Sequence, residues 1–526
     1  MRAVSLRWLV VPLGVSFACS RPQAGTGAEG DAVLRYAQVG SVTSLDPARA
    51  GWTVESRVIE QMAEGLTDVD ASLQIRAALA DSWEVTDGGR TFRFRLREGV
   101  SLGEGHFLTS ADVAAALTRL AAPGDLVGWS VVADVEGAEA YRSGRATRVA
   151  GIETPDPRTL VVRLVSPSGR FLYQLATATA VVFAGAGSEE DWARGRIPGS
   201  GPFRLESLQV FGRMGPRRQR LVFRARTGAP QPPRIHGMVW DLYPTAAELL
   251  QGLALEKYDV VSTSDPHGTS FSRALPGYRL RQAVSLGFLG LYFDCQKPPL
   301  NRAEVRRAIA LAADREALGT SDLLPGFRLP GTLGPSPADA VLRRDPEAAR
   351  VLAARAGLDS RRPVTLRVAY SAGFEYGDLS GWIRGPLARS LEPLGLRVEP
   401  VEVRRSALDQ HFSARLDHAY LFGSFPDTMD PCLVLEPFRS QGAAFNWSWY
   451  SRPEVDADYR DCARSHDVAS QQSAISHALR LVAEDAPLLP LTRIRQRVYV
   501  GPRVEGFVPS PLEGVDFRTV ALRSGP

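Results

Sequence analysis

The chain has very little lysine, and its basic residues give no sign of a nucleic-acid partner. Of its 62 lysines and arginines, only Lys257 and Lys297 are lysines. The formal net charge of +4 over 526 residues is small and gives no reason to expect binding to a phosphate backbone. A mutational bias towards arginine explains the imbalance as well as any function does. We therefore expect no nucleic-acid partner.

The motifs of common catalytic sites are also missing. The sequence contains no phosphate-binding loop, no G-x-S-x-G elbow, no H-E-x-x-H and no C-x-x-C pair. Its seven histidines lack the spacing of a metal site. The sequence therefore predicts a protein that is not an enzyme, has no catalytic residues and needs neither a cofactor nor a metal.

The start of the chain has the form of an export signal. Two arginines precede an apolar run over Trp8–Ala18, which is too short to span a bilayer but has the length of a signal-peptide core. Cys19 follows directly and resembles the lipobox cysteine of bacterial lipoproteins, although Ser16 and Phe17 depart from that pattern. Lipidation at Cys19 and plain secretion are the two interpretations, and we favour lipidation.

This start predicts where the protein resides. Residues 1–19 are expected to be a signal peptide ending at the lipidated cysteine, and residues 20–30 a flexible tether. No later run is apolar enough to span a membrane. We expect an extracytoplasmic protein, in the periplasm or at the cell surface, held to the membrane by a lipid on Cys19.

An odd number of cysteines remains after Cys19. Cys295, Cys432 and Cys462 allow at most one disulfide in an oxidising compartment. The sequence does not select a pair, and small buried thiols are an equally good interpretation.

Strand and helix signals alternate along the rest of the chain. A hairpin is predicted around the turn Asp87-Gly88-Gly89, because Phe92, Phe94 and Leu96 alternate with arginines and form one apolar face. Alternating elements of this kind favour an α/β or α+β fold.

Three helix starts carry capping signals. Thr109 and Asp112 predict a capping box. Asn301 is expected to cap a second helix, and the Asp-Pro pair at 345–346 opens a third that ends at Gly357.

A series of short motifs then occurs in a particular order. The motifs are ADSWEV (80–85), FRFRLREGV (92–100), LTSADV (108–113), GSGPFRL (199–205), the block from LYFD to VRRA (291–308), the helix ending in AG (345–357) and EDAPLLPL (484–491). In this order they resemble the peptide- and nickel-type extracytoplasmic solute-binding proteins of family 5, which serve ABC importers. The resemblance covers roughly residues 33–520.

The resemblance implies an α/β fold of two hinge-connected lobes that close over a cleft, the cluster C type of periplasmic binding protein, with an extra domain. Lobe I would combine residues 31–70, 197–288 and 494–526. The extra domain would be residues 71–196, and lobe II residues 289–493. Two chain crossings near 288 and 493 would form the hinge.

One segment, GSFPDTMDP at 423–431, resembles the loop that carries an aspartate for a peptide's α-ammonium group. The aligned residue is Asp427, and an enclosed ammonium needs such a charged partner. Asp430 would then hold the turn. Ser424 stands where the family often has tryptophan, and Asp427 as a plain turn residue is the alternative.

An aromatic cluster follows this loop. It consists of Phe445, Trp447, Trp449 and Tyr450. Such residues line a ligand cleft or, more often, pack in a core, and both interpretations stay open.

The resemblance implies a monomeric receptor that captures di- or oligopeptides and delivers them to the transmembrane subunits of an ABC permease. Two alternatives remain. One is a receptor for a non-peptide nutrient such as a metal chelate, a sugar or haem, and the other is a sensing receptor without a transport role.

Overall fold

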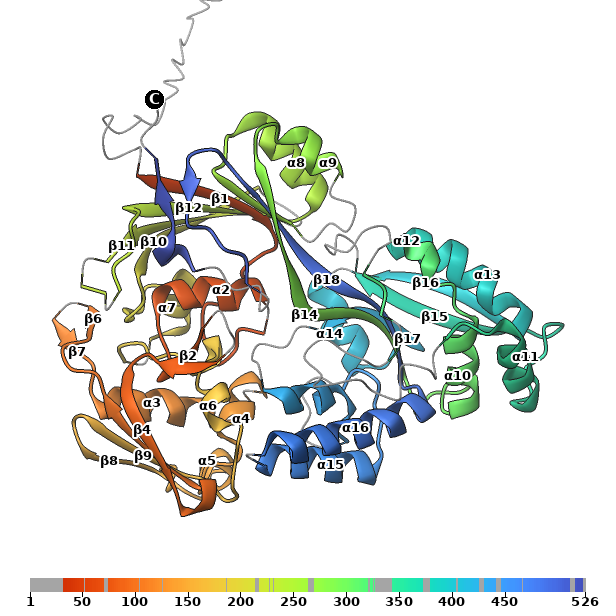
Figure 1. The fold of residues 1–526 in the computed structure, drawn as a ribbon, viewed down its shortest axis with the longest axis horizontal. Coiled ribbons are helices and arrows are strands. Elements are labelled where there is room, and N and C mark those ends of the chain that lie inside the picture. The colour runs from red at the N-terminus through yellow and green to blue at the C-terminus, as the bar shows by residue number, and fades with distance from the viewer. Residues whose placement is uncertain are drawn as a thin grey trace, which may run out of the picture.

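Two lobes joined by a pair of long strands make up the protein in the computed structural model (Figure 1). No helix of the described residues is long and apolar enough to cross a membrane. The structure describes residues 32–523 except 52, 71–73, 104, 125, 186, 213–216, 227, 230, 264–268, 320–321, 325, 327–342, 372–378, 404, 425–429, 441–445, 466 and 511–515.

A mixed ten-stranded sheet runs through both lobes. Strands β1, β12 and β13 are parallel neighbours in the first lobe, and β15, β16 and β17 in the second. In sheet order the strands are β10 (Phe203–Phe211), β11 (Arg218–Ala225), β12 (Gly237–Tyr243), β1 (Val33–Val39), β13 (Val260–Thr263), β18 (Leu488–Val500), β14 (Arg279–Phe293), β17 (Ala419–Ser424), β15 (Val364–Ser371) and β16 (Leu396–Val403).

Strands β14 and β18 carry the chain from one lobe to the other (Figure 1). They pair antiparallel from Arg279 opposite Val500 to Tyr292 opposite Leu488. The register shifts between Val284 and Phe288, so that several residues of β14 oppose one of β18. A bulge of this kind bends the strand and interrupts the ladder. It lies beside the crossings expected near residues 288 and 493.

Aromatic packing joins distant segments of the first lobe. The Tyr36 ring of β1 lies 4.9 Å from the Trp240 ring of β12, and Trp240 lies 5.7 Å from Phe517 near the C-terminus. Asp259 accepts hydrogen bonds from the Arg503 guanidinium at 2.6 and 2.8 Å. These contacts bring three segments that are far apart in sequence into one unit. Helices α2 (Thr53–Met62), α7 (Glu189–Arg194), α8 (Ala246–Leu255) and α9 (Thr269–Ala274) accompany them.

A separate antiparallel sheet has its own core. Its strands, in order, are β4 (Ala80–Thr86), β5 (Thr91–Leu96), β9 (Thr159–Arg163) and β8 (Ile152–Asp156). The predicted hairpin is confirmed, because β4 and β5 pair around Asp87–Gly89 and Phe92, Phe94 and Leu96 are buried. The sheet packs with α3 (Ser110–Leu120), α4 (Leu126–Val132), α5 (Ala138–Arg142) and α6 (Phe171–Gln174).

The second lobe has the largest continuous core, from Phe288 to Leu491. A disulfide joins Cys432 to Cys462, and Cys295 is a free thiol. The structure thus selects one of the pairs among which the sequence could not choose. Helices of this lobe include α10 (Ala303–Ala312), α11 (Pro346–Arg355), α12 (Leu379–Trp382), α13 (Ala388–Leu391), α14 (Arg405–Ser413), the 3₁₀ helix η7 (Pro431–Phe438), α15 (Pro453–Arg464) and α16 (Val468–Asp485).

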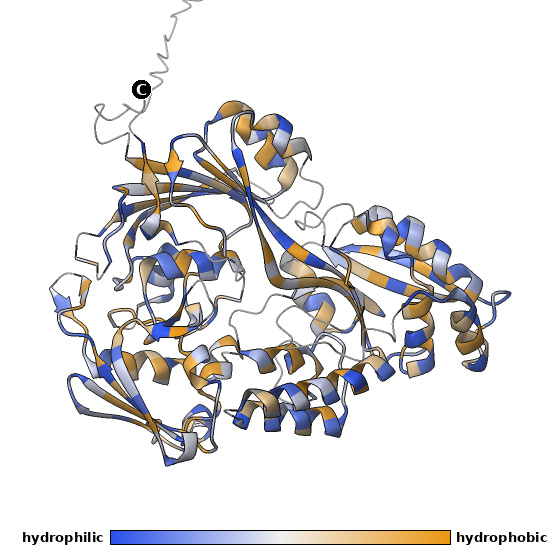
Figure 2. Cartoon of the chain, in the orientation of Figure 1, coloured by the Kyte–Doolittle hydropathy of each residue, from blue (hydrophilic) through white to orange (hydrophobic). Residues whose placement is uncertain are grey.

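Amphipathic helices cover the two lobes. Figure 2 shows polar residues along the outer faces of α15 and α16. The inward-facing residues of α16 include Ile475, Leu479 and Val482, which are buried in the core of this lobe. This spacing of three and four residues places one apolar stripe on the core side.

Two of the three predicted helix starts are confirmed. Asp112 accepts hydrogen bonds from Thr109, and Asp345 accepts one from the Ala348 amide at 2.9 Å, with Gly357 just beyond the helix end. The third prediction is wrong by one position. Helix α10 is preceded by Arg302, whose side chain makes no capping hydrogen bond, rather than by Asn301.

Candidate functional site

The segment expected to hold a ligand begins beside the interlobe strands. Strand β17 ends at Ser424, which pairs with Phe288 of β14, directly after the bulge. Asp427 and Phe445, like Cys19, lie outside the described residues. Asp430, at the far end of this segment, accepts a hydrogen bond from the Cys432 amide at 2.9 Å. Its predicted role in holding the turn is therefore confirmed.

Asp430 also contacts the other side of the molecule. Its carboxylate lies 2.6 Å from the Nε atom of Arg170, which precedes α6 in the separate sheet domain. Only 11% of the Arg170 side chain and 1% of the Asp430 side chain are exposed. One end of the candidate ligand segment, Ser424, therefore lies next to the interlobe strands. The other end, Asp430, contacts Arg170 of the separate sheet domain.

Asn446 shapes the turn that carries the predicted aromatic residues. Its side-chain amide donates to the carbonyl oxygens of Arg439 and Tyr450, both at 2.8 Å. Its carbonyl accepts from the amides of Ser448 and Tyr450 and from the Ser448 hydroxyl. One side chain thus fixes both sides of the turn.

Trp447 and Trp449 are half-buried in a cluster of five aromatic rings. The Phe412 ring of α14 lies 4.2 Å from both of them, stacked on Trp449 and edge-on to Trp447. Phe422 and Tyr420 of β17 complete the cluster, 4.7 Å from Trp447 and 5.9 Å from Trp449 respectively. Offset and edge contacts of this kind rigidify an aromatic surface. The structure thus brings these two predicted residues together directly beside β17.

Tyr450 occupies a different environment. It is buried in the core of the second lobe, and its hydroxyl donates to Asp485 at 2.6 Å. Burial and this hydrogen bond raise the pKa of Tyr450. Its polar end is therefore already satisfied within the protein.

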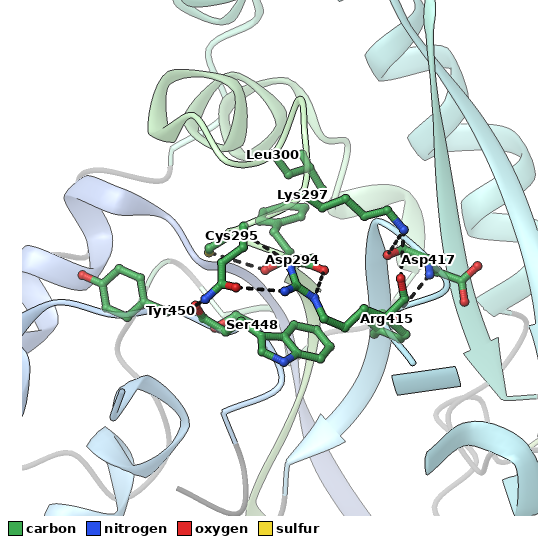
Figure 3. Close-up of polar contacts among 12 residues, drawn as sticks. Asp294, Cys295, Lys297, Leu300, Arg415, Asp417, Ser448 and Tyr450 are labelled. Atoms are coloured by element: carbon green, nitrogen blue, oxygen red, sulfur yellow. Dashed lines mark hydrogen bonds and ion pairs between the residues drawn. The ribbon is translucent and has the colours of Figure 1, made fainter. Parts of the chain in front are cut away.

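An ion pair places the aromatic turn against the end of β14 (Figure 3). Asp294, fully buried, binds the Arg415 guanidinium through two hydrogen bonds, one of them at 2.9 Å and the other short. The guanidinium carbon lies 4.9 Å from the centre of the Trp449 ring, within the range of a cation–π contact. Asp294 therefore holds Arg415, and Arg415 holds Trp449.

The residues that follow Asp294 bind the turn that carries Ser448 and Trp449 and the turn that carries Arg415. The Cys295 amide donates to the Ser448 carbonyl at 2.9 Å, and the Lys297 ammonium donates to the carbonyls of Arg415, Leu416 and Asp417. Burial raises the pKa of the Cys295 thiol to about 12, so the group stays protonated at neutral pH.

Three residues of this site were missed in the sequence. Asp294 is part of the LYFD motif, but the motif alone did not indicate that its carboxylate binds an arginine. Phe412 and Arg415 carry no local signal, because what defines them is a contact with a turn more than thirty residues away. No group of three or more metal-binding side chains occurs in the part of the chain that the structure describes.

The comparison with protein families decides the identity at the level of family. Residues 74–446 match the model for the bacterial extracellular solute-binding proteins, family 5. The chain belongs to this family. It is thus an extracytoplasmic solute-binding protein, and the resemblance seen in the sequence motifs is confirmed, as is the two-lobed α/β fold.

Individual relatives are distant in sequence but match nearly the whole chain. The peptide transport periplasmic protein SapA of Salmonella typhimurium is 25% identical over 93% of this chain and 92% of its own length. The OppA structure from Burkholderia pseudomallei has a TM-score of 0.80 at 22% identity, covering 94% of this chain and 99% of that one. The structure of AgaA from A. tumefaciens R10, in complex with agropinic acid, has a TM-score of 0.77 at 20% identity, covering 94% and 99%.

Asp294→Asn tests the support of the aromatic turn. The change keeps the shape of the side chain but leaves the Arg415 charge without its buried partner, so we expect a loss of about 2 kcal/mol in the free energy of unfolding. Urea denaturation followed by circular dichroism measures this. Asp461→Asn, an exposed carboxylate of α15, is the control and should stay within about 0.5 kcal/mol of the parent. Equal behaviour of the two variants would contradict this account.

Proposed function

We propose that the protein is the peptide receptor of an ABC importer. It captures di- or oligopeptides between its lobes, as a monomer, and delivers them to the transmembrane subunits of the permease. The observation that carries the proposal is the position of two described residues, Ser424 beside the interlobe strands and Asp430 at the contact with Arg170, which flank residues 425–429 in the sequence. SapA, a relative over nearly the whole chain, is named a peptide transport protein.

In this proposal Asp427 binds the α-ammonium group of the peptide. A closed binding site removes water from that ammonium, and a carboxylate restores its hydrogen bonds and balances its charge. The remaining peptide contacts would be made by main-chain groups, as in strand addition, which leaves the peptide side chains less constrained.

The aromatic residues would supply apolar contacts. Trp447 and Trp449 are half-buried and held in place by Phe412, so they lose little conformational entropy when a ligand stacks against them. Phe445 belongs to the same proposal. Tyr450 does so less directly, because its hydroxyl already binds Asp485.

The proposed division of the chain follows the expected limits. Lobe I combines residues 31–70, 197–288 and 494–526, with 71–196 as the extra domain and 289–493 as lobe II. The core of the second lobe supports this division, since one cluster lies within 288–491. The core of the extra domain extends beyond the expected limits, because it also includes Ala48 and Leu66. Closure then takes place at β14 and β18, and the ligand favours the closed state by contacting both lobes.

Native mass spectrometry of the mature chain from residue 20 tests peptide capture. The protein is measured as purified and again after unfolding and refolding without ligand. We expect a ladder of bound peptide masses that disappears on refolding. In Asp427→Asn the ladder should weaken strongly, since losing the charged partner of the ammonium costs about 2–3 kcal/mol, or roughly a hundredfold in affinity.

Three results would redirect the proposal. A single non-peptide mass would favour the receptor for a metal chelate, sugar or haem, and would make Asp427 a turn residue. An empty protein with no thermal shift in peptide pools would favour a sensing receptor without transport. Loss of the ladder in the control Asp461→Asn as well would mean that Asp427 has no particular part in binding.

We also propose that a lipid on Cys19 anchors the protein to the membrane. The cysteine stands directly after the apolar run. Stable attachment takes two membrane-binding signals, which a cysteine that carries more than one acyl chain would supply. Full-length protein expressed in a bacterium should incorporate labelled fatty acid and sediment with membranes. The Cys19→Ser variant should do neither. Label in both forms, or in neither form, would contradict lipidation at this residue.

A further inference from the structure

The parallel strands of the first lobe end together beside β18. Strands β1 and β12 end at Val39 and Tyr243, which pair with each other, and β13 ends at Thr263, which pairs with Arg497 of β18. Because β18 runs antiparallel to β13, Gln496 stands just beyond the carboxyl end of β13. In open α/β sheets, ligands bind outside the carboxyl ends of the parallel strands.

Gln496 of β18 and Gln38 of β1 lie on the same face of the sheet. Gln38 pairs with Ser262 of β13, and Ser262 pairs with Val498 of β18. Residues two apart along a strand point to the same side, so Gln496 shares the face of Val498. This is the face that carries the core containing Tyr36 and Val498.

The Gln496 side chain is buried without a partner. Only 1% of the residue is exposed, and neither its amide nitrogen nor its amide oxygen has a hydrogen-bond partner in the part of the chain that the structure describes. Ile494 and Val498, its neighbours on this face of β18, are apolar, as is Ala283 opposite it on β14. Buried amides are nearly always hydrogen-bonded, because an unpaired one is costly to enclose. The arrangement therefore indicates a partner from outside the chain.

Gln38 has one end of its amide fixed and the other end open. Its oxygen accepts hydrogen bonds from the Tyr36 hydroxyl at 2.9 Å and from the Arg57 guanidinium at 3.2 Å. Its nitrogen has no partner among the described residues, although only 2% of the residue is exposed. Two donors to the oxygen leave it no free lone pair, so Gln38 presents only its N–H groups.

We propose that Gln496 and Gln38 form a subsite for the main chain of a bound peptide. In an extended peptide, the N–H and C=O of one residue point to the same side, and a glutamine amide offers the matching acceptor and donor. Gln496 binds that pair, and Gln38 donates to a second carbonyl oxygen. The inference rests on the proposed function, and it names two residues that recognise a peptide by its backbone rather than by its side chains.

One short peptide is long enough to reach both amides. Gln38 and Gln496 are two strands and two residues apart, which separates their Cα atoms by about 12 Å. An extended tripeptide spans about 10 Å, and the glutamine side chains bridge the remainder. Since both residues are almost fully enclosed, the ligand enters when the lobes are apart. Water then hydrates the amides, so closure without a ligand leaves them unpaired and is disfavoured.

Gln496→Met separates a ligand contact from a structural role. Methionine keeps the length of the side chain and removes both polar atoms. The mature protein, refolded without ligand, is titrated with a proteolytic digest of casein and followed by native mass spectrometry. We expect the half-saturating concentration to rise about tenfold or more, by a similar factor for peptides of different sequence. The ligand-free variant should unfold at the parental temperature or above it, since no unpaired amide is enclosed.

Gln471→Met is the matched control. Gln471 of α16 is also buried, at 9% exposure, but its amide donates to the Ser465 carbonyl at 2.9 Å. This variant should unfold at a lower temperature and keep peptide binding within about twofold of the parent. Gln38→Glu is a second test. It keeps the oxygen that accepts from Tyr36 and Arg57 but loses both amide N–H groups, so it should also weaken peptide binding about tenfold.

The outcomes distinguish this inference from the proposed function. If the parent binds no peptide from the digest, both fall. If the parent binds peptides and Gln496→Met binds them equally well, the receptor stands and the subsite is overturned. A destabilised Gln496→Met with parental binding would mean that the amide holds a buried water only. A loss confined to peptides with one kind of side chain would contradict recognition of the main chain.

Discussion

The antiparallel pairing of β14 with β18 is the constraint on which the rest of the structure depends. These two strands belong to the same ten-stranded sheet as the strands of both lobes. The strands of one lobe pair near one end of the β14–β18 ladder, and those of the other lobe pair near its other end. The bulge after Val284 interrupts that ladder where the lobes meet. An interrupted ladder bends at lower cost than a continuous one, which is why we propose that the lobes close here.

The arginine-rich composition has a structural consequence that lysine could not reproduce. Planar guanidinium groups bind carboxylates through two hydrogen bonds and stack on rings at the same time. Arg415 does both, with Asp294 and Trp449, and Arg503 binds Asp259 in the same forked manner. Arg170 likewise contacts both a carboxylate and a ring across the interface between the extra domain and lobe II, with its Nε atom 2.6 Å from Asp430 and its guanidinium carbon 5.4 Å from the centre of the Tyr459 ring. Such pairs join segments that are distant in sequence.

The sequence was sufficient where signals are local or belong to a family pattern. The β4–β5 hairpin, the cap at Asp345 and the family itself could be predicted, because turn residues, capping side chains and ordered motifs are visible in short windows. The cap at Asn301 failed, because the chain enters α10 one residue later.

What the sequence could not supply are contacts between distant segments. Nothing near Arg170 indicates Asp430, 260 residues further on, and the disulfide partner of Cys432 was one of several choices. Trp447 and Trp449 were correctly grouped, yet their partner Phe412 lies on a different element. Such pairs are chosen by the fold as a whole, and no local pattern of residues encodes them.

Small-angle X-ray scattering of one preparation in two states tests the central claim that β14 and β18 join lobes which close on a ligand. The mature protein is measured as purified and after refolding without ligand. This account predicts a larger radius of gyration for the refolded protein, and a return to the smaller value when the released ligand fraction is added back. Identical scattering of the two states, with ligand loss verified by mass, would contradict closure at these strands.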